Sequence, residues 1–186
     1  MTIFCAVDTE TGSLDPDAAG PWEIAIHRYA ISEAAKPAFT PLASALIHVD
    51  PYPGLNIASQ KALEIGGFYD RHLKEYSADV MDERQAAMVV QAMTADAIFV
   101  GSSPWFDRDM LAAMLARHGW RGLWHHRMRD VPTLVEGRLG GEVGGLDSAL
   151  DAVWPDGWDP VKYPRHTAWG DATAARDLHL WSRGLL

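Results

Sequence analysis

The amino-acid sequence predicts an α/β fold with a mixed five-stranded sheet, in which an antiparallel meander precedes parallel strands and helices flank the sheet. Three observations lead to this fold class. β-prone segments cluster in residues 1–50, helical and β-prone segments alternate after residue 80, and the 186 residues are 48% hydrophobic and 22% charged, as in globular proteins. We therefore expect one domain spanning residues 1–186.

The first three strands are predicted by apolar and β-branched runs. Residues 3–7 are all apolar, which is typical of a central strand covered on both faces, and Asp8 lies at the carboxyl end of this run. Residues 22–31 alternate between apolar and polar side chains, and residues 44–49 are a third β-prone run. Three successive runs of this kind indicate a meander.

A turn and a helical segment are expected after the meander. Residues 51–54 (Pro-Tyr-Pro-Gly) predict the turn. Residues 56–65 have helical composition until the Gly66-Gly67 pair interrupts them. We expect this region to be peripheral.

The second half of the chain predicts alternating helices and strands. Helices are expected at residues 80–93 with Ser77 or Asp79 as the cap, at 104–118, from Asp130-Val131-Pro132 onward, and at 168–182; strands are expected at 97–100 and 123–125. A helix followed at once by a strand implies a parallel crossover. Residues 154–164, rich in Pro, Gly and Trp, are expected to form an ordered loop.

Charge and composition narrow the function classes. A formal net charge of −9 argues against a protein that coats nucleic acid by neutralising many phosphates. This objection weakens for an enzyme that grips a few nucleotides at a chain end with the help of metal ions. The chain has no apolar run near the roughly 18 residues that cross a membrane and no secretory signal, so we expect a soluble, cytoplasmic protein without a membrane partner.

Asp8 and Glu10 are the first candidate metal ligands. Two residues apart on an extended strand, their side chains leave the same face, which suits joint ligation of one ion. The alternative is a solvated pair of acids where a strand meets a loop.

Asp107 and Asp171 lie near the start of two predicted helices. Asp107 shares a helical stripe with Leu111 and Leu115, so we expect it to face the sheet, whereas Asp109 does not share that stripe. The alternative for Asp107 is an exposed acid favoured by the helix dipole. His166 precedes Asp171 in a non-helical approach, and a histidine there can accept a proton from a metal-bound water; the alternative is an ordinary surface histidine.

Three segments carry a family resemblance. Residues 8–14 read Asp-Thr-Glu-Thr-Gly-Ser-Leu, residues 106–111 read Phe-Asp-Arg-Asp-Met-Leu, and residues 166–171 read His-Thr-Ala-Trp-Gly-Asp. The chain therefore resembles the DEDDh subgroup of the DnaQ-like 3'-5' exonuclease superfamily, whose motifs commonly read Asp-x-Glu-Thr-Thr-Gly-Leu, Phe-Asp-x-x-Phe-Leu and His-x-Ala-x-x-Asp. It departs from the family at the fifth and sixth letters of the first motif, and Ser102-Ser103 replaces a frequent His-Asn.

The resemblance implies an RNase H-like fold and a two-metal-ion 3'-5' exonuclease that releases nucleoside 5'-monophosphates from single-stranded RNA or DNA. Asp8, Glu10 and Asp171 would hold one Mg²⁺ or Mn²⁺ ion, Asp8 would bridge to a second, and Asp107 would complete the site. His166 would be the general base. Hard oxygen ligands favour these ions over zinc.

Further residues are candidate contacts with the 3' end of the substrate. Leu14 occupies the position that wedges against the terminal base in the family, with ordinary loop packing as the alternative. The remaining candidates are Thr11, Gly12 and Ser13 for the terminal sugar, Trp105 for base stacking, and Lys162 and Arg165 for phosphates.

Two other functions stay open on the sequence. One is a catalytically silent nucleic-acid-binding module of the same fold, although such a module has no need of all five residues. The other is a metallo-phosphoesterase acting on small nucleotides, which the acidic net charge would suit. Exposed tryptophans in residues 154–158 would favour a homodimer.

Overall fold

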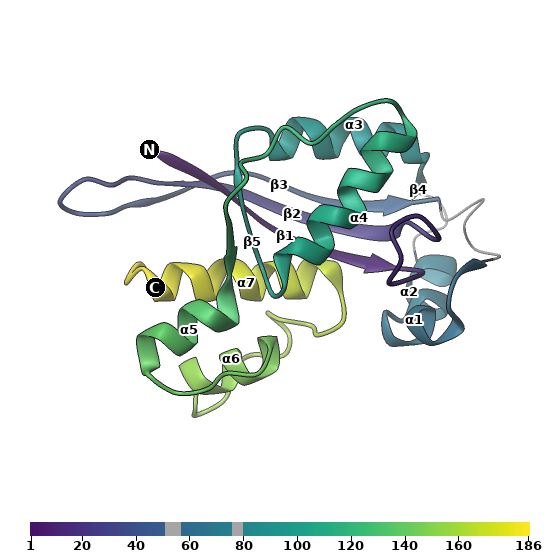
Figure 1. Ribbon diagram of the computed structural model, residues 1–186. Helices are drawn as coiled ribbons and strands as arrows, with labels where there is room; N and C mark the ends of the chain where they lie inside the picture. Colours follow the sequence, from purple (N-terminus) through teal and green to yellow (C-terminus); the bar gives the residue numbers. More distant parts are fainter. Residues whose placement is uncertain (51–56, 76–79) are drawn as a thin grey trace.

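The computed structural model describes residues 1–50, 57–75 and 80–186, which form a mixed sheet between two layers of helices (Figure 1). The strands lie in the order β4-β3-β2-β1-β5-β6. Their bounds are β1 (Thr2–Thr11), β2 (Pro21–Ile31), β3 (Phe39–Val49), β4 (Val80–Met81), β5 (Ile98–Gly101) and β6 (Met128–Asp130). The predicted α/β class is confirmed, with one strand more than the five expected: the two-residue β4.

The sheet has an antiparallel half and a parallel half. β1 pairs antiparallel with β2, and β2 pairs antiparallel with β3, as expected for a meander. β5 pairs parallel with β1, β6 pairs parallel with β5, and β4 pairs parallel with the end of β3. β1 is therefore central, and the carboxyl end of β5 lies beside the middle of β1, just before Asp8.

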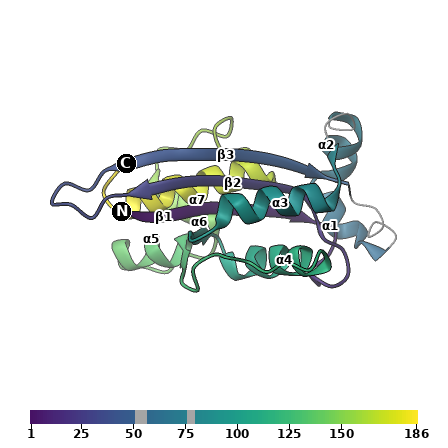
Figure 2. The same cartoon turned by 90° about the horizontal axis from the view of Figure 1, so that it is seen from above.

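Helices cover both faces of the sheet. The helices are α1 (Gln60–Ile65), α2 (Phe68–Glu75), α3 (Glu83–Thr94), α4 (Pro104–Arg117), α5 (Val131–Leu139), α6 (Leu146–Val153) and α7 (Ala168–Ser182). Figures 1 and 2 show α3 and α4 on one face, with α7, α5 and α6 on the other. α1 and α2 lie at the end of the sheet where β1 ends.

Alternation along β1 explains the two cores. Phe4 and Ala6 are buried on the face that packs against α5, α6 and α7, whereas Cys5 and Val7 are buried on the face that packs against α3 and α4. The run of apolar residues thus fills both layers at once, as expected for a strand covered on both faces. Among the described residues, no helix is both long enough and apolar enough to cross a membrane.

Several predicted boundaries are wrong. β1 continues to Thr11, beyond the expected end at residue 7, because the following residues still pair with β2. The last strand of the sheet is residues 128–130 rather than 123–125. α3 begins later than expected, with Asp82 accepting a hydrogen bond from the backbone N–H of Gln85 as its cap.

Other expectations fall outside the described residues or need correction. The turn at residues 51–54 and the caps Ser77 and Asp79 lie outside them. Helices α2 and α6 were not predicted. The loop at residues 154–164 is confirmed as non-helical, but Trp154 and Trp158 are half-buried, with ring centroids 5.8 and 6.4 Å from that of Tyr163. The exposed tryptophans that would favour a homodimer are therefore not found in this loop.

Leu111 tests the packing of the helix that carries Asp107. It is 0% exposed in the core between α4 and the sheet, so Leu111→Ala is expected to lower the free energy of unfolding by about 2–5 kcal/mol. Urea unfolding measures the change. Leu139→Ala is the control, because Leu139 is 50% exposed and its loss is expected to cost about 0.5 kcal/mol or less. Equal effects of the two substitutions would contradict the assignment of Leu111 to the core.

Candidate active site

Three carboxylates from the two ends of the chain meet at the end of β1. Asp8 and Glu10 point to the same face of the sheet, and Asp171 lies in the first turn of α7, which packs on that face. One ligand atom from each of Asp8, Glu10 and Asp171 lies within 4.8 Å of the others. The structure therefore brings together three of the four predicted metal ligands, from segments at opposite ends of the sequence.

Asp107 approaches from the other layer of helices. It lies in the first turn of α4, is 3% exposed, and its Oδ1 accepts a hydrogen bond from the hydroxyl of Thr9 at 2.8 Å. Thr9 precedes Glu10 and follows Asp8, so this bond fixes Asp107 beside the acids. The predicted sheet-facing position is confirmed, and Asp109 is exposed in an ion pair with Arg108.

Burial and like charge raise the pKa values of these acids. Burial raises the pKa of Asp8 well above its ordinary value, and the negative charges of Asp107 and Glu10 raise it further. Burial likewise raises the pKa of Glu10 to about 7, with Arg71 acting in the opposite direction. Burial raises the pKa of Asp107 to about 7, although the hydrogen bonds from Thr9 oppose the shift. Each acid is thus easier to ionise if a cation is near.

The donor set fits a hard divalent cation. All the candidate ligands are carboxylate oxygens, which Mg²⁺, Mn²⁺ and Ca²⁺ prefer, and three of them converge within coordination reach. Burial and neighbouring acids raise the pKa values of Asp8 and Glu10, so ionising both is unfavourable without a nearby positive charge. A cation bound among these oxygens would offset that repulsion, so the residues fit the ions that the sequence predicts.

Arg165 pairs directly with one of these acids. Its guanidinium donates hydrogen bonds to Asp171 through Nη1 and to the exposed Asp147 through Nε. Arg165 also lowers the pKa values of Asp8 and Glu10 against the larger effect of burial. To contact a phosphate, as the sequence predicts, Arg165 would have to share its donors with these carboxylates.

His166 lies in the turn that leads into α7. Its backbone has a φ of 57° and its side chain is exposed. A left-handed conformation at a residue other than glycine costs roughly 1–3 kcal/mol and persists where neighbouring contacts hold it. The carbonyl of His166 accepts a hydrogen bond from Arg71 at 3.2 Å. The exposed imidazole is therefore carried on a constrained backbone just before the helix that supplies Asp171.

The turn after Glu10 is held by its own backbone and by α1. The hydroxyl of Thr11 donates to the carbonyl of Ser13 at 2.8 Å, and the N–H of Ser59 donates to the carbonyl of Gly12 at 2.7 Å. A Cβ at Gly12 would lie 3.0 Å from the Cβ atoms of Ala19 and Ala58, so the close packing favours glycine. Leu14 is 81% exposed, which contradicts the loop-packing alternative for this residue.

Trp105 and Lys162, two other candidate substrate contacts, differ in how free their side chains are to meet a ligand. Trp105 is 50% exposed in the first turn of α4, two residues before Asp107. Lys162 forms an ion pair with Asp177 at 2.9 Å and lies over the ring of Tyr163. The Trp105 ring is thus open to a ligand, whereas the Lys162 ammonium is engaged within the structure.

Glu23 and Arg71 were missed as parts of the site. Glu23 lies opposite Glu10 in the strand register and is 1% exposed. Burial alone would raise the pKa of Glu23, but hydrogen bonds from His48 and Arg71 outweigh it, so the pKa is lowered and the carboxylate is ionised. The available signal was a charged residue in the apolar run of β2, on the face shared with Ala25 and His27.

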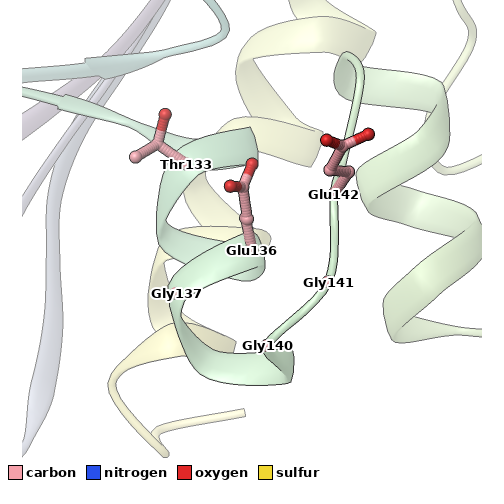
Figure 3. A pocket seen from close by; sticks show the side chains of 6 residues that line it. All are labelled: Thr133, Glu136, Gly137, Gly140, Gly141 and Glu142. Atoms are coloured by element: carbon pink, nitrogen blue, oxygen red, sulfur yellow. The ribbon is translucent and has the colours of Figure 1, made fainter.

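A pocket of about 500 Å³ lies elsewhere, at the end of α5 (Figure 3). Glu136 and Glu142 line it together with Thr133 and three glycines. The end of α5 contacts the end of α7, because Arg138 donates to the carbonyl of Trp181, whereas Asp171 lies about 15 Å away at the start of α7. None of the five predicted catalytic residues lines this pocket, and we assign it no role.

The raised pKa of Asp107 gives a pH prediction for the protein in EDTA. Unfolded Asp107 loses its proton near its ordinary pKa of 3.8, whereas the folded carboxyl keeps it up to about 7. The folded state binds more protons in this window, so the contribution of Asp107 to stability falls as pH rises from about 4 to about 7. The free energy of unfolding of Asp107→Asn should therefore fall less than that of the wild type as pH rises over this range. Urea unfolding at several pH values measures both.

The matched control for this measurement is Asp109→Asn, on the same helix and exposed to solvent. Its pH profile should follow the wild type. An Asp107→Asn profile parallel to the wild type would show that the carboxyl titrates alike in the folded and unfolded states.

Comparison with known proteins shows the same fold in an enzyme of known structure. E. coli exonuclease I in complex with a dT13 oligonucleotide aligns with a TM-score of 0.66 and 15% identity, over 98% of this chain and 41% of that chain. The zinc-bound form of the E. coli exonuclease I complex with single-stranded DNA aligns with a TM-score of 0.61 and 16% identity, over the same shares.

These likenesses show the fold and confirm the RNase H-like architecture that was predicted. The chain spans about 41% of the length of the exonuclease I chain. No protein-family model matches the sequence, and no curated protein matches it.

Proposed function

We propose that the protein is a metal-dependent 3'-5' exonuclease of the DEDDh type, which hydrolyses phosphodiester bonds at the 3' end of single-stranded RNA or DNA. We further propose that residues 1–186 act as one catalytic domain. The observation that carries the proposal is the convergence of Asp8, Glu10 and Asp171 within 4.8 Å, with Asp107 held beside them through Thr9.

The proposed site holds two Mg²⁺ or Mn²⁺ ions. Asp8, Glu10 and Asp171 would bind one ion, Asp8 would bridge to the second, and Asp107 would complete the second site directly or through water. When bound, such ions lower the pKa of a nucleophilic water and stabilise the oxygen that leaves from the phosphate. The carboxylates themselves contribute position, because each comes from a different rigid element or strand position.

His166 is the proposed general base. Its imidazole is exposed next to the helix that carries Asp171, so it can accept a proton from the attacking water and release it to solvent. Thr9 has a supporting part, because its hydroxyl donates to Oδ1 of Asp107 and so orients this carboxylate.

The proposed substrate contacts come from the turn after Glu10, from α4 and from the segment before α7. Leu14 and Trp105 offer exposed apolar side chains to the terminal bases. Thr11, Gly12 and Ser13 form the constrained turn that would contact the terminal sugar, and Arg165 would contact a phosphate. The fold shared with exonuclease I in its complexes with a dT13 oligonucleotide and with single-stranded DNA supports a single-stranded substrate.

The proposal predicts that activity depends on the acids and on the metal. Release of mononucleotides from a 3'-labelled oligonucleotide should require Mg²⁺ or Mn²⁺ and stop in EDTA. Asp8→Ala should abolish detectable activity, and His166→Ala should lower kcat by about 10²–10⁴-fold, the contribution of a general base. Asp109→Ala, an exposed acid on the same helix as Asp107, should retain wild-type activity. Full activity of Asp8→Ala or His166→Ala would refute the mechanism.

The same assay separates the other functions. Matched RNA and DNA oligomers of several lengths identify the preferred sugar and length. Rapid hydrolysis of free nucleotides without cleavage of oligomers would instead show a phosphoesterase for small nucleotides, which the net charge of −9 suits because it does not attract a long polyanion. Binding of oligomers by the wild type without any cleavage would show a silent binding module.

Trp105 predicts a stacking contribution to binding. Trp105→Ala should weaken the binding of a fluorescent single-stranded oligonucleotide by about 1–3 kcal/mol, the usual loss for one stacked base. The measurement uses Asp8→Ala protein, in which the oligonucleotide is not consumed. Trp105→Phe should retain most of the affinity, because it keeps an aromatic face. Equal affinities of the Ala and Phe variants would place the bases elsewhere.

A further inference from the structure

We propose that Arg71 is a positioning residue, which holds the backbone of His166 and the start of α7 through its ion pair with Glu23. The catalytic effect of this positioning rests on the proposed function. The contacts that define the inference do not depend on that function; they connect α2, β2 and the turn before α7.

Arg71 uses its guanidinium to reach three acceptors. Nη1 donates to Oε1 of Glu23 at 2.5 Å, and Nη2 donates to the carbonyls of Gly66 at 2.6 Å and His166 at 3.2 Å. Nε donates to the same Gly66 carbonyl at 3.1 Å. The guanidinium also lies 5.0 Å from the ring centroid of Trp22. A planar fork with several fixed donors makes this set of bonds, and the single ammonium of lysine does not.

Glu23 extends the connection to the first residue of α7. Its Oε2 accepts a hydrogen bond from the backbone N–H of Ala168 at 2.8 Å. The ion pair therefore binds the peptide groups on both sides of Thr167: the carbonyl of His166 and the N–H of Ala168. Because His166 has a left-handed backbone, which a residue other than glycine keeps only where neighbours hold it, these two bonds explain how the turn keeps its shape.

The turn that Arg71 holds and the segment that carries Arg71 both contact elements that present acids of the site. The hydroxyl of Thr167 accepts from the N–H of Gly170 at 3.0 Å, so the turn that Arg71 holds is also the cap of the helix that presents Asp171. On the other side, a Cβ at Gly66 would lie 2.6 Å from Oε2 of Glu10. The α1–α2 segment therefore packs against the site at the end of the sheet.

The test compares Arg71→Lys and Arg71→Ala with a matched control, Arg138→Ala. Arg138 also lies over a tryptophan ring, that of Trp181 at 4.5 Å, and donates to a backbone carbonyl, but on α5. Both Arg71 variants should lower kcat by roughly 10–100-fold and leave KM for a single-stranded oligonucleotide within about threefold. Arg138→Ala should change neither. Added guanidinium ion, but not urea at the same concentration, should restore part of the kcat of Arg71→Ala.

A spectroscopic readout tests the positioning without any reaction. In protein labelled at histidine, the His166 ring signals, identified by their loss in His166→Gln, should shift or broaden in both Arg71 variants and return in Arg71→Ala when guanidinium is added. The signals of His125 and His126 should not move. If Arg71→Ala does not fold, Arg71→Lys carries both measurements.

The outcomes are separable. Folded Arg71 variants with wild-type His166 signals and wild-type kcat would overturn the inference, as would a loss of kcat that occurs without any change at His166. A wild-type protein without nuclease activity would refute the proposed function, and the His166 signals would then decide alone whether Arg71 positions this turn.

Discussion

The mutual repulsion of carboxylates at the end of β1 is the constraint on which the rest of the structure depends. Burial and like charge raise the pKa values of Asp8, Glu10 and Asp107, so assembling them opposes folding above the ordinary carboxyl range. The cores on the two faces of the sheet must offset this cost. The cluster proposed to bind cations is therefore also a locally destabilising arrangement, and bound cations would offset that cost.

Compensating charge around this cluster comes from two arginines with different roles. Arg165 pairs directly with Asp171, one of the acids, and is the proposed contact for a phosphate. Arg71 instead pairs with the ionised Glu23, which is not one of the proposed metal ligands, and donates a hydrogen bond to the backbone before α7. The buried ion pair of Arg71 and Glu23 costs less free energy than an isolated buried charge, and its hydrogen bonds also fix the geometry of the turn. In the proposed function Arg165 would contact a ligand, whereas Arg71 holds the turn before α7.

Much of the fold was readable from the sequence, for local reasons. The bounds of α7 and the cap at Asp130 follow from side chains within one turn of the helix ends, and the meander follows from apolar runs. The errors lie where distant contacts decide: pairing with β2 extends β1 past Asp8, and a parallel partner makes residues 128–130 a strand. Convergence of the acids followed from strand and helix periodicity. The part of Arg71 did not, because its partners lie 48 and 95 residues away along the chain.

The separation in sequence between β1 and α7 also bears on how the protein is made. Glu23 and Ala168, whose hydrogen bond joins the sheet to the last helix, are 145 residues apart. On a ribosome the early strands emerge many seconds before α7, at about 5–20 residues per second. Until then Asp8 and Glu10 lack both Asp171 and the turn that carries His166. A growing chain therefore lacks the complete set of proposed catalytic residues until α7 has emerged and packed on the sheet.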